Sequence, residues 1–283
     1  MRDEVLSDEV WENCRFASSL AACQLRGMSP KYAKFVYDAW TNPQTLAIIS
    51  EIAGIELVPN MDYEIGHINI SVQHQQSSAK DNDTQDLPAA PVVNWHKDSY
   101  PFVCVLMLSD ASEMKGGETA LQTGTGEIMK VRGPQMGSAV VLQGRYITHI
   151  ALPSTNFRER ITMVTSFRPK DPSVPEDSVL TTIRPVSDLR ELYNQWTEYR
   201  IEIVEERCRR LVKKVRGRKR VGRDFDVEGV KAEIEELKNF LERTSDQLVA
   251  KEEDPVSDEK AEEKEQVGKA DEEFSRNRKR ARL

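Results

Sequence analysis

Two histidines and one aspartate are the residues whose types and spacing could support chemistry. His96 and Asp98 lie two positions apart in the strand-like run PVVNWHKD, and His149 lies in the later strand-like run YITHIAL. Residues two apart on a strand point to the same face. Two imidazoles and one carboxylate that converge form the ligand set that holds iron(II) while leaving coordination positions open. The alternative is an exposed polar turn, which the bare His-x-Asp pattern favours.

The order of features after His96 favours the metal site. GGET follows at 116–119 and PQMGS at 134–138, and Arg160 leads a strand-like run after His149. In this order, residues 61–168 resemble the Fe(II)/2-oxoglutarate-dependent dioxygenase superfamily. The resemblance implies a double-stranded β-helix (jelly-roll) core, iron(II) at the three ligands, and 2-oxoglutarate and O2 as co-substrates.

The same resemblance assigns a clamp for 2-oxoglutarate. It implies that Arg160 binds the far carboxylate with help from Thr162, and a bidentate guanidinium suits a carboxylate. Arg158 shares the strand parity of Arg160 and stays open as an alternative. Asn69, on the polar face of HINISVQ, is expected to contact 2-oxoglutarate or substrate, unless that face is solvated. Further candidates for substrate contacts are His67, Gln143 and Arg145.

Composition limits the class of protein. The chain has 283 residues and a net charge of -7, which allows one sizeable catalytic domain with appendages and argues mildly against a dedicated nucleic-acid binder. Its four cysteines show no CxxC spacing and are typical of reduced thiols. No apolar run is long enough to span a membrane, and the N-terminus has no signal core. We therefore expect a cytoplasmic or nuclear location.

The periodicity of apolar residues predicts a mainly β protein with flanking helices (α+β). Helices are expected over 8–26, from an N-cap at Ser29 to residue 42, and over 45–53. Eight short strands fit between 61 and 168, interrupted by a polar loop at 75–90 that could serve as a lid. Two helices follow, the first with Ser187 as N-cap. The expected division is helices over 1–60, a catalytic domain over 61–170, a helical extension over 171–250 and a charged, disordered tail over 251–283.

Two basic tracts lie near the end of the chain. Ten of the seventeen residues from Arg207 to Arg223 are Lys or Arg, and the chain ends in RNRKRARL. Such tracts are typical of nucleic-acid contact or nuclear import. A solvated helix face is the alternative, and the acidic run at 252–273 favours it, because it would repel phosphates.

The sequence therefore predicts an oxygenase that couples oxidative decarboxylation of 2-oxoglutarate to hydroxylation or related C–H oxidation. The run RPKDPSVPEDSVLTTIRPVSDLRELY resembles fungal members of the superfamily, which favours a small-molecule substrate such as an amino acid or a natural-product intermediate. One alternative is a nuclear protein or nucleic-acid hydroxylase or demethylase. A second, from another class, is a non-catalytic β-barrel binding module.

Overall fold

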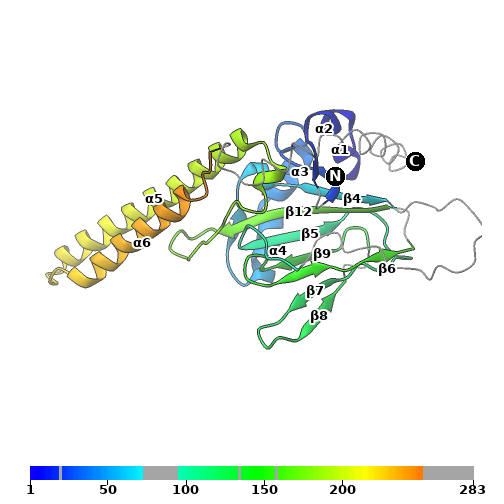
Figure 1. The fold of residues 1–283 in the computed structure, drawn as a ribbon. Coiled ribbons are helices and arrows are strands. Elements are labelled where there is room, and N and C mark those ends of the chain that lie inside the picture. The colour runs from blue at the N-terminus through cyan, green and yellow to red at the C-terminus, as the bar shows by residue number, and fades with distance from the viewer. Residues whose placement is uncertain (19–20, 73–94, 133–134, 157–158, 251–283) are drawn as a thin grey trace, which may run out of the picture.

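The computed structural model describes residues 1–18, 21–72, 95–132, 135–156 and 159–250, and within them the protein is mainly antiparallel sheet with helices (Figure 1). A seven-stranded sheet has the order β1-β2-β4-β12-β5-β9, and β3 also pairs with β12. Its strands are β1 (Arg15–Ser18), β2 (Ala21–Leu25), β3 (Leu57–Pro59), β4 (His67–Val72), β5 (Phe102–Met107), β9 (Ala139–Leu142) and β12 (Glu159–Pro169).

A smaller sheet lies against one face of the large one. It has the order β10-β7-β8, with β7 (Thr119–Gln122), β8 (Ile128–Val131) and β10 (His149–Ala151). A two-stranded sheet pairs β6 (Lys115–Gly116) with β11 (Ser154–Thr155). Val103 and Leu142 of the large sheet pack against Leu121 of β7. This apolar contact joins the two sheets and defines the face between them.

Strand β12 shows how the sequence separates the two faces of the large sheet. Ile161, Met163 and Phe167 belong to the main core, whereas Val164 packs on the contact between the sheets. Because side chains alternate along a strand, Arg160 and Thr162 share the face of Val164. The face that looks toward the smaller sheet therefore carries both polar and apolar residues.

Helices near the N-terminus cover the other face of the large sheet. They are α1 (Arg2–Val5), α2 (Asp8–Asn13), α3 (Lys34–Thr41) and α4 (Pro43–Ala53). Trp40 of α3 packs on Phe167, with ring centroids 6.1 Å apart, and its indole N–H donates to the sulfur of Met163. As expected, α4 ends at Gly54, whose φ of 73° lies in the left-handed region that glycine adopts without strain.

Two long helices form a hairpin that projects away from the sheets (Figure 1). They are α5 (Leu189–Arg220) and α6 (Val227–Ser245), and the short 3-10 helices η1 (Asp62–Glu64) and η2 (Arg184–Val186) lie near the base. Trp196 and Phe240 are buried there with Tyr63 and Tyr100. Among the described residues, no helix is both long and apolar enough to cross a membrane.

The structure corrects three sequence predictions about local structure. The helix expected over 8–26 ends at Asn13, and β1 and β2 follow, because Cys23 and Leu25 pack into the main core as part of the sheet. Ser29 is not an N-cap, since α3 begins only at Lys34. Ser187 is not the N-cap of α5 either: the side chain of Asp188 accepts from the N–H of Arg190. In each case tertiary packing or a neighbouring polar residue outweighed the local pattern.

Candidate metal centre

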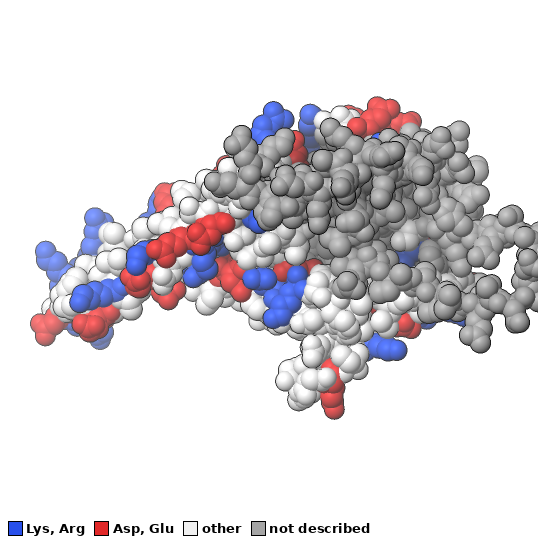
Figure 2. All heavy atoms as spheres, viewed as in Figure 1, with Lys and Arg blue, Asp and Glu red and all other residues white. Residues whose placement is uncertain are grey.

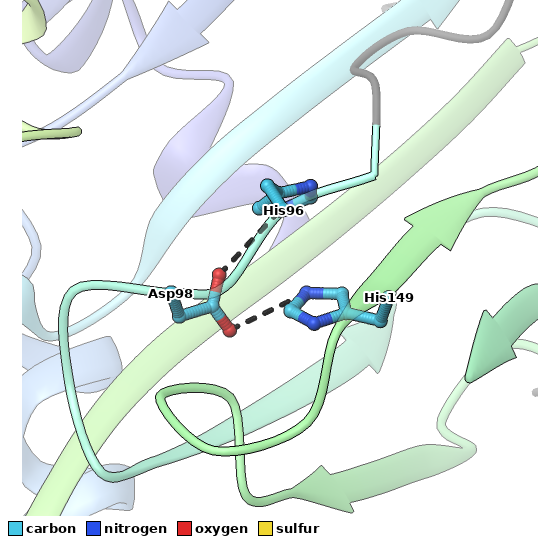
Figure 3. A group of neighbouring side chains, drawn as sticks. All are labelled: His96, Asp98 and His149. Carbon is cyan, nitrogen blue, oxygen red and sulfur yellow. Dashed lines mark ion pairs between the residues drawn. The ribbon is translucent and has the colours of Figure 1, made fainter. Parts of the chain in front are cut away.

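His96, Asp98 and His149 lie together between the two sheets (Figure 3). Nε2 of His96 is 3.6 Å from one carboxylate oxygen of Asp98, and Nε2 of His149 is 3.5 Å from the other. The two imidazole centroids are 4.4 Å apart, and one ligand atom from each residue lies within 4.8 Å of the others. The sequence prediction that these three side chains converge is confirmed.

Backbone hydrogen bonds hold the three ligands in place. His96 and His149 form an isolated antiparallel bridge, with N–H to carbonyl distances of 3.0 and 2.9 Å. The N–H of Asp98 donates to the carbonyl of Gly144 at 2.9 Å. The described residues around His96 form this one bridge and no strand, so the predicted strand is wrong at this point. The bridge still brings both histidines to one place, because it pairs them directly.

The hydrogen bond of His149 indicates a cation between this residue and Asp98. Its Nδ1 lies 2.9 Å from the carbonyl oxygen of Ile147, which can only accept, so Nδ1 carries a proton. In the neutral ring, Nε2 then bears a lone pair, and that lone pair faces a carboxylate oxygen. Two acceptors attract each other only through a proton or a metal ion between them. The donor set therefore fits a divalent metal of the kind bound by two histidines and one carboxylate.

The pKa values of Asp98 and His149 show the same attraction between these two side chains. Burial alone would raise the pKa of Asp98, but hydrogen bonds to His149 and His96 and their charges lower it to about 2. Burial would lower the pKa of His149, but the hydrogen bond to Asp98 and its charge outweigh burial, so the pKa is raised. The site therefore stabilises a positive charge next to Asp98.

Arg160 lies on the same sheet face as Thr162 and has no anionic partner among the described residues. Arg160 pairs with Ser71 of β4, and Thr162 pairs with Asn69. Arg160 is half-buried, its Nε is buried without a hydrogen-bond partner among the described residues, and burial lowers the pKa of the guanidinium. A cation withdrawn from water is costly unless an anion accompanies it. Arg160 is therefore positioned to receive an anion in the space between the sheets.

His67 faces the same space and is fixed in one tautomer. Its Nδ1 lies 3.0 Å from Nη1 of Arg26, and a guanidinium can only donate, so the proton of a neutral His67 is on Nε2. Arg26 is itself held by a buried ion pair with Glu64. Burial first, and then the charge of Arg26, lower the pKa of His67 well below its ordinary value. His67 thus presents a neutral N–H donor whose nitrogen is buried without a partner among the described residues.

The other sequence candidates are placed less favourably. The side-chain oxygen of Asn69 accepts from Gln24 at 3.1 Å, so its amide group remains as a donor on the inner face. Gln143 is exposed. The guanidinium of Arg145 donates to the carbonyl of Asp177 at 3.2 Å and lies near its carboxylate. Outside the described residues lie the second clamp candidate, Arg158, the loop at 75–90 and the tail at 251–283.

Sequence reasoning missed two residues that shape the site. A Cβ on Gly144 would lie 2.1 Å from an oxygen of the Asp98 carboxylate, so this position must be glycine for the ligand to keep its place. The sequence did hold one signal for this role, namely a glycine shortly before His149. Arg26 sets the tautomer of His67, but residues 8–26 were predicted as a helix, which hid its position beside β4.

The sequence matches no protein-family model, and it matches no curated protein. Solved structures that align with it include an oxidoreductase of the 2OG-Fe(II) oxygenase family from Burkholderia pseudomallei, at 15% identity over 54% of this chain and 63% of that chain, with a TM-score of 0.36. This chain thus spans less than two thirds of that protein. The alpha-ketoglutarate-dependent non-heme epimerase SnoN from nogalamycin biosynthesis aligns at 14% identity over 59% of this chain and 69% of that chain, with a TM-score of 0.40. A prolyl-4-hydroxylase from Pseudomonas putida aligns at 16% identity over 53% of this chain and 72% of that chain, with a TM-score of 0.29. The chemistry of the site therefore has to be inferred from its own residues.

Proposed function

We propose that this protein is an iron(II)- and 2-oxoglutarate-dependent oxygenase that oxidises a C–H bond of a small molecule. The observation that supports it most is Arg160, a half-buried residue whose buried Nε has no hydrogen-bond partner among the described residues, on the sheet face that looks toward His149. A structural metal site would need no such cation. The two sheets would be the walls of a double-stranded β-helix.

His96, Asp98 and His149 would hold the metal, and Nδ1 of His149 would keep its bond to Ile147 so that Nε2 stays available. Iron(II) held there supplies oxygen activation, by which 2-oxoglutarate, O2 and R–H give succinate, CO2 and R–OH. Arg160 would bind the far carboxylate of 2-oxoglutarate through two parallel hydrogen bonds. The neighbouring Thr162 would add a hydroxyl contact.

The prime substrate would bind at the other end of the inner face. His67 pairs with Val164, four residues along β12 from Arg160, which corresponds to roughly 13 Å of strand. The charge of Asp98 acts on His67, so this imidazole lies on the metal side of the site. Its fixed Nε2–H would donate to an oxygen of the substrate. Exposed Gln143 and ion-paired Arg145 are weaker candidates for this contact.

The two alternatives have less support. Of the ten cations between Arg207 and Arg223, five bond to acceptors of this chain: Arg207, Arg209, Arg210, Lys214 and Arg218. That pairing reduces what the tract could offer to nucleic acid. A non-catalytic binding module would not need three convergent metal ligands beside a half-buried cation that has no anionic partner among the described residues. A nuclear location, and fungal origin, remain sequence-based predictions.

Succinate release tests the proposal and separates the substrate classes. The chain would be incubated with iron(II), 2-oxoglutarate and oxygen, and with panels of amino acids, oligonucleotides or peptides. We expect slow uncoupled succinate formation that amino acids or related small molecules stimulate, and none with His96→Ala. Stimulation by oligonucleotides or peptides alone would contradict the small-molecule assignment. Equal succinate yields from wild type and His96→Ala would contradict the proposal that this site is enzymatic.

A further inference from the structure

The outer half of the α5–α6 hairpin has no buried core of its own. All of residues 204–239 are described, and none of them is buried, whereas Ile203 and Phe240 at the base are. Two helices that pack only on each other bury too little apolar surface to account for such long, regular elements. The projecting helices (Figure 1) therefore expose surface that a further partner could cover.

Large apolar side chains are exposed on both helices of the hairpin. Two lie on α5 and three on α6, with exposed fractions between 41% and 53%: Ile201, Val212, Val227, Ile234 and Leu241. Contacts across the hairpin show which residues face the opposite helix: Arg200 with Thr244, Arg207 with Phe240, Lys214 with Glu233, and Arg218 with Asp226.

All five apolar residues lie on one side of the hairpin. Four of them follow directly after a residue that faces the opposite helix, namely Arg200, Asp226, Glu233 or Phe240. One residue further along a helix is a rotation of about 100°. Because the helices are antiparallel and face each other, that rotation leads to the same side of the pair on both. Val212 lies three turns after Ile201 and shares its face.

Beside this apolar face, the charged residues without an ion-pair partner among the described residues change sign between the two ends, and Lys238, nearer the base, pairs with Glu235 of its own helix. Glu198 and Glu205 are the helical neighbours of Ile201 near the base, and Arg216, Lys219 and Lys231 lie near the tip. Glu205 pairs with Arg209, but Glu198 and the three tip cations have no ion-pair partner among the described residues. Lys and Arg side chains are visible at the free end of the hairpin, beside acidic ones (Figure 2).

We propose that a second copy of this chain covers this face. The two hairpins would pack with the tip of one beside the base of the other, which completes a four-helix bundle. In that direction the cations at each tip meet Glu198 and Glu205 of the other copy, and the apolar stripes meet at the centre. An isologous pair of this kind uses one surface twice, so the same residues serve both copies.

The mass of the full chain, measured by sedimentation across micromolar concentrations, tests the interface. We expect a dimer, and Ile234→Asp should weaken it by roughly a hundredfold or more, because each copy would bury an unpaired carboxylate. Ile52→Asp is the matched control, since Ile52 is 64% exposed on α4, away from the hairpin. A chain that stays monomeric, or an Ile234→Asp dimer as tight as wild type, would overturn the proposal. So would a monomer whose hairpin binds anionic vesicles in an Ile234-dependent way.

Charge reversal tests the direction of packing. The double variant Glu198→Lys/Glu205→Lys and the double variant Arg216→Glu/Lys219→Glu should each weaken the dimer, because like charges would then meet. Combining all four changes should restore it. Dimers that are insensitive to either double variant, or that the fourfold variant fails to restore, would exclude the antiparallel pairing. Circular dichroism would verify that α5 keeps its helicity.

Discussion

In the proposed function, the guanidinium of Arg160 would connect the candidate metal ligands to a co-substrate. It lies on β12 opposite Ser71, and its buried Nε has no hydrogen-bond partner among the described residues. The ligands alone would fit several divalent metals, because two histidines and a carboxylate bind iron, manganese and zinc alike. The combination with a cation that needs an anion is what points to a carboxylate-bearing co-substrate.

Replacement of Arg160 should therefore weaken 2-oxoglutarate binding rather than metal binding. We expect Arg160→Ala to raise the Kd of 2-oxoglutarate by roughly 10- to 150-fold, the equivalent of a lost charge-assisted hydrogen bond. Arg160→Lys should recover part of the loss, because it keeps the charge but not the bidentate geometry. Calorimetric titration of the metal-loaded protein measures both. If Arg158→Ala has the larger effect, the clamp is Arg158.

Gly144 should be required for metal binding although it supplies no ligand atom. A methyl group at this position would overlap the Asp98 carboxylate, as the 2.1 Å separation of its ideal Cβ from that oxygen shows. We expect Gly144→Ala to lower metal affinity by roughly 10- to 100-fold, as is usual when a residue that orients a ligand is lost. Gly124→Ala is the matched control, since a Cβ there meets nothing within 4 Å. Equal metal affinity in the two variants would contradict the placement of Asp98.

Metal affinity should fall as the pH drops below neutrality. The pKa of His149 is raised above its ordinary value because the bond to Asp98 and its charge outweigh burial. Below this raised pKa, a proton occupies Nε2 and must leave before the metal binds. We expect affinity for Co2+, used as a stable probe, to decrease by about tenfold per pH unit in that range. An affinity that is flat between mildly acidic and neutral pH would show that no proton is displaced.

At the scale of elements, the N-terminal segment belongs to the large sheet more closely than its sequence indicates. Strands β1 and β2 extend the large sheet beyond β4, and Leu25 pairs with Ile68 and is fully buried. The same segment carries Arg26, which orients His67. The N-terminal segment therefore helps to position the inner face of the site.

Truncation of Leu25 should destabilise the whole domain. We expect Leu25→Ala to lower the free energy of unfolding by about 2–5 kcal/mol, the usual cost of removing a buried leucine side chain. Ile52→Ala, at an exposed position on α4, should change it by about 0.5 kcal/mol or less. Urea denaturation measures both. If the two variants lose similar stability, β2 does not form part of the core.

The strand pattern and the convergence of the three candidate metal ligands could be predicted from the sequence for a definite physical reason. In HINISV apolar residues alternate with polar ones, and ITMVTSF is rich in Ile, Val and Thr; each run lies in a strand with one face in the core. The helix predicted over 8–26 was wrong in its second half, because Trp11, Cys14 and Ala21 suit a helical period equally well. Only the pairing of β2 with β4 favours strands there. Gly144 and the unpartnered state of Arg160 depend on distances between remote residues, which no local pattern records.

At the scale of the whole molecule, two sheets hold a site between them while a helical hairpin extends away from it. The hairpin joins the body through Trp196, Arg200 and Tyr199, all buried at its base, where Arg200 pairs with the buried Glu176. The proposed dimer interface therefore lies apart from the metal ligands. Variants of Ile234 should leave metal binding unchanged, and variants of His96 should leave the dimer unchanged.

The most direct test is an anaerobic optical titration of the full chain with iron(II) and then 2-oxoglutarate. Chelation of iron(II) by a 2-oxo acid produces a weak visible charge-transfer band, which neither component gives alone. We expect the band to appear with wild type, to vanish in His96→Ala, and to require more 2-oxoglutarate in Arg160→Ala. The absence of a band in wild type, or an identical band in His96→Ala, would contradict an iron and 2-oxoglutarate site at these residues.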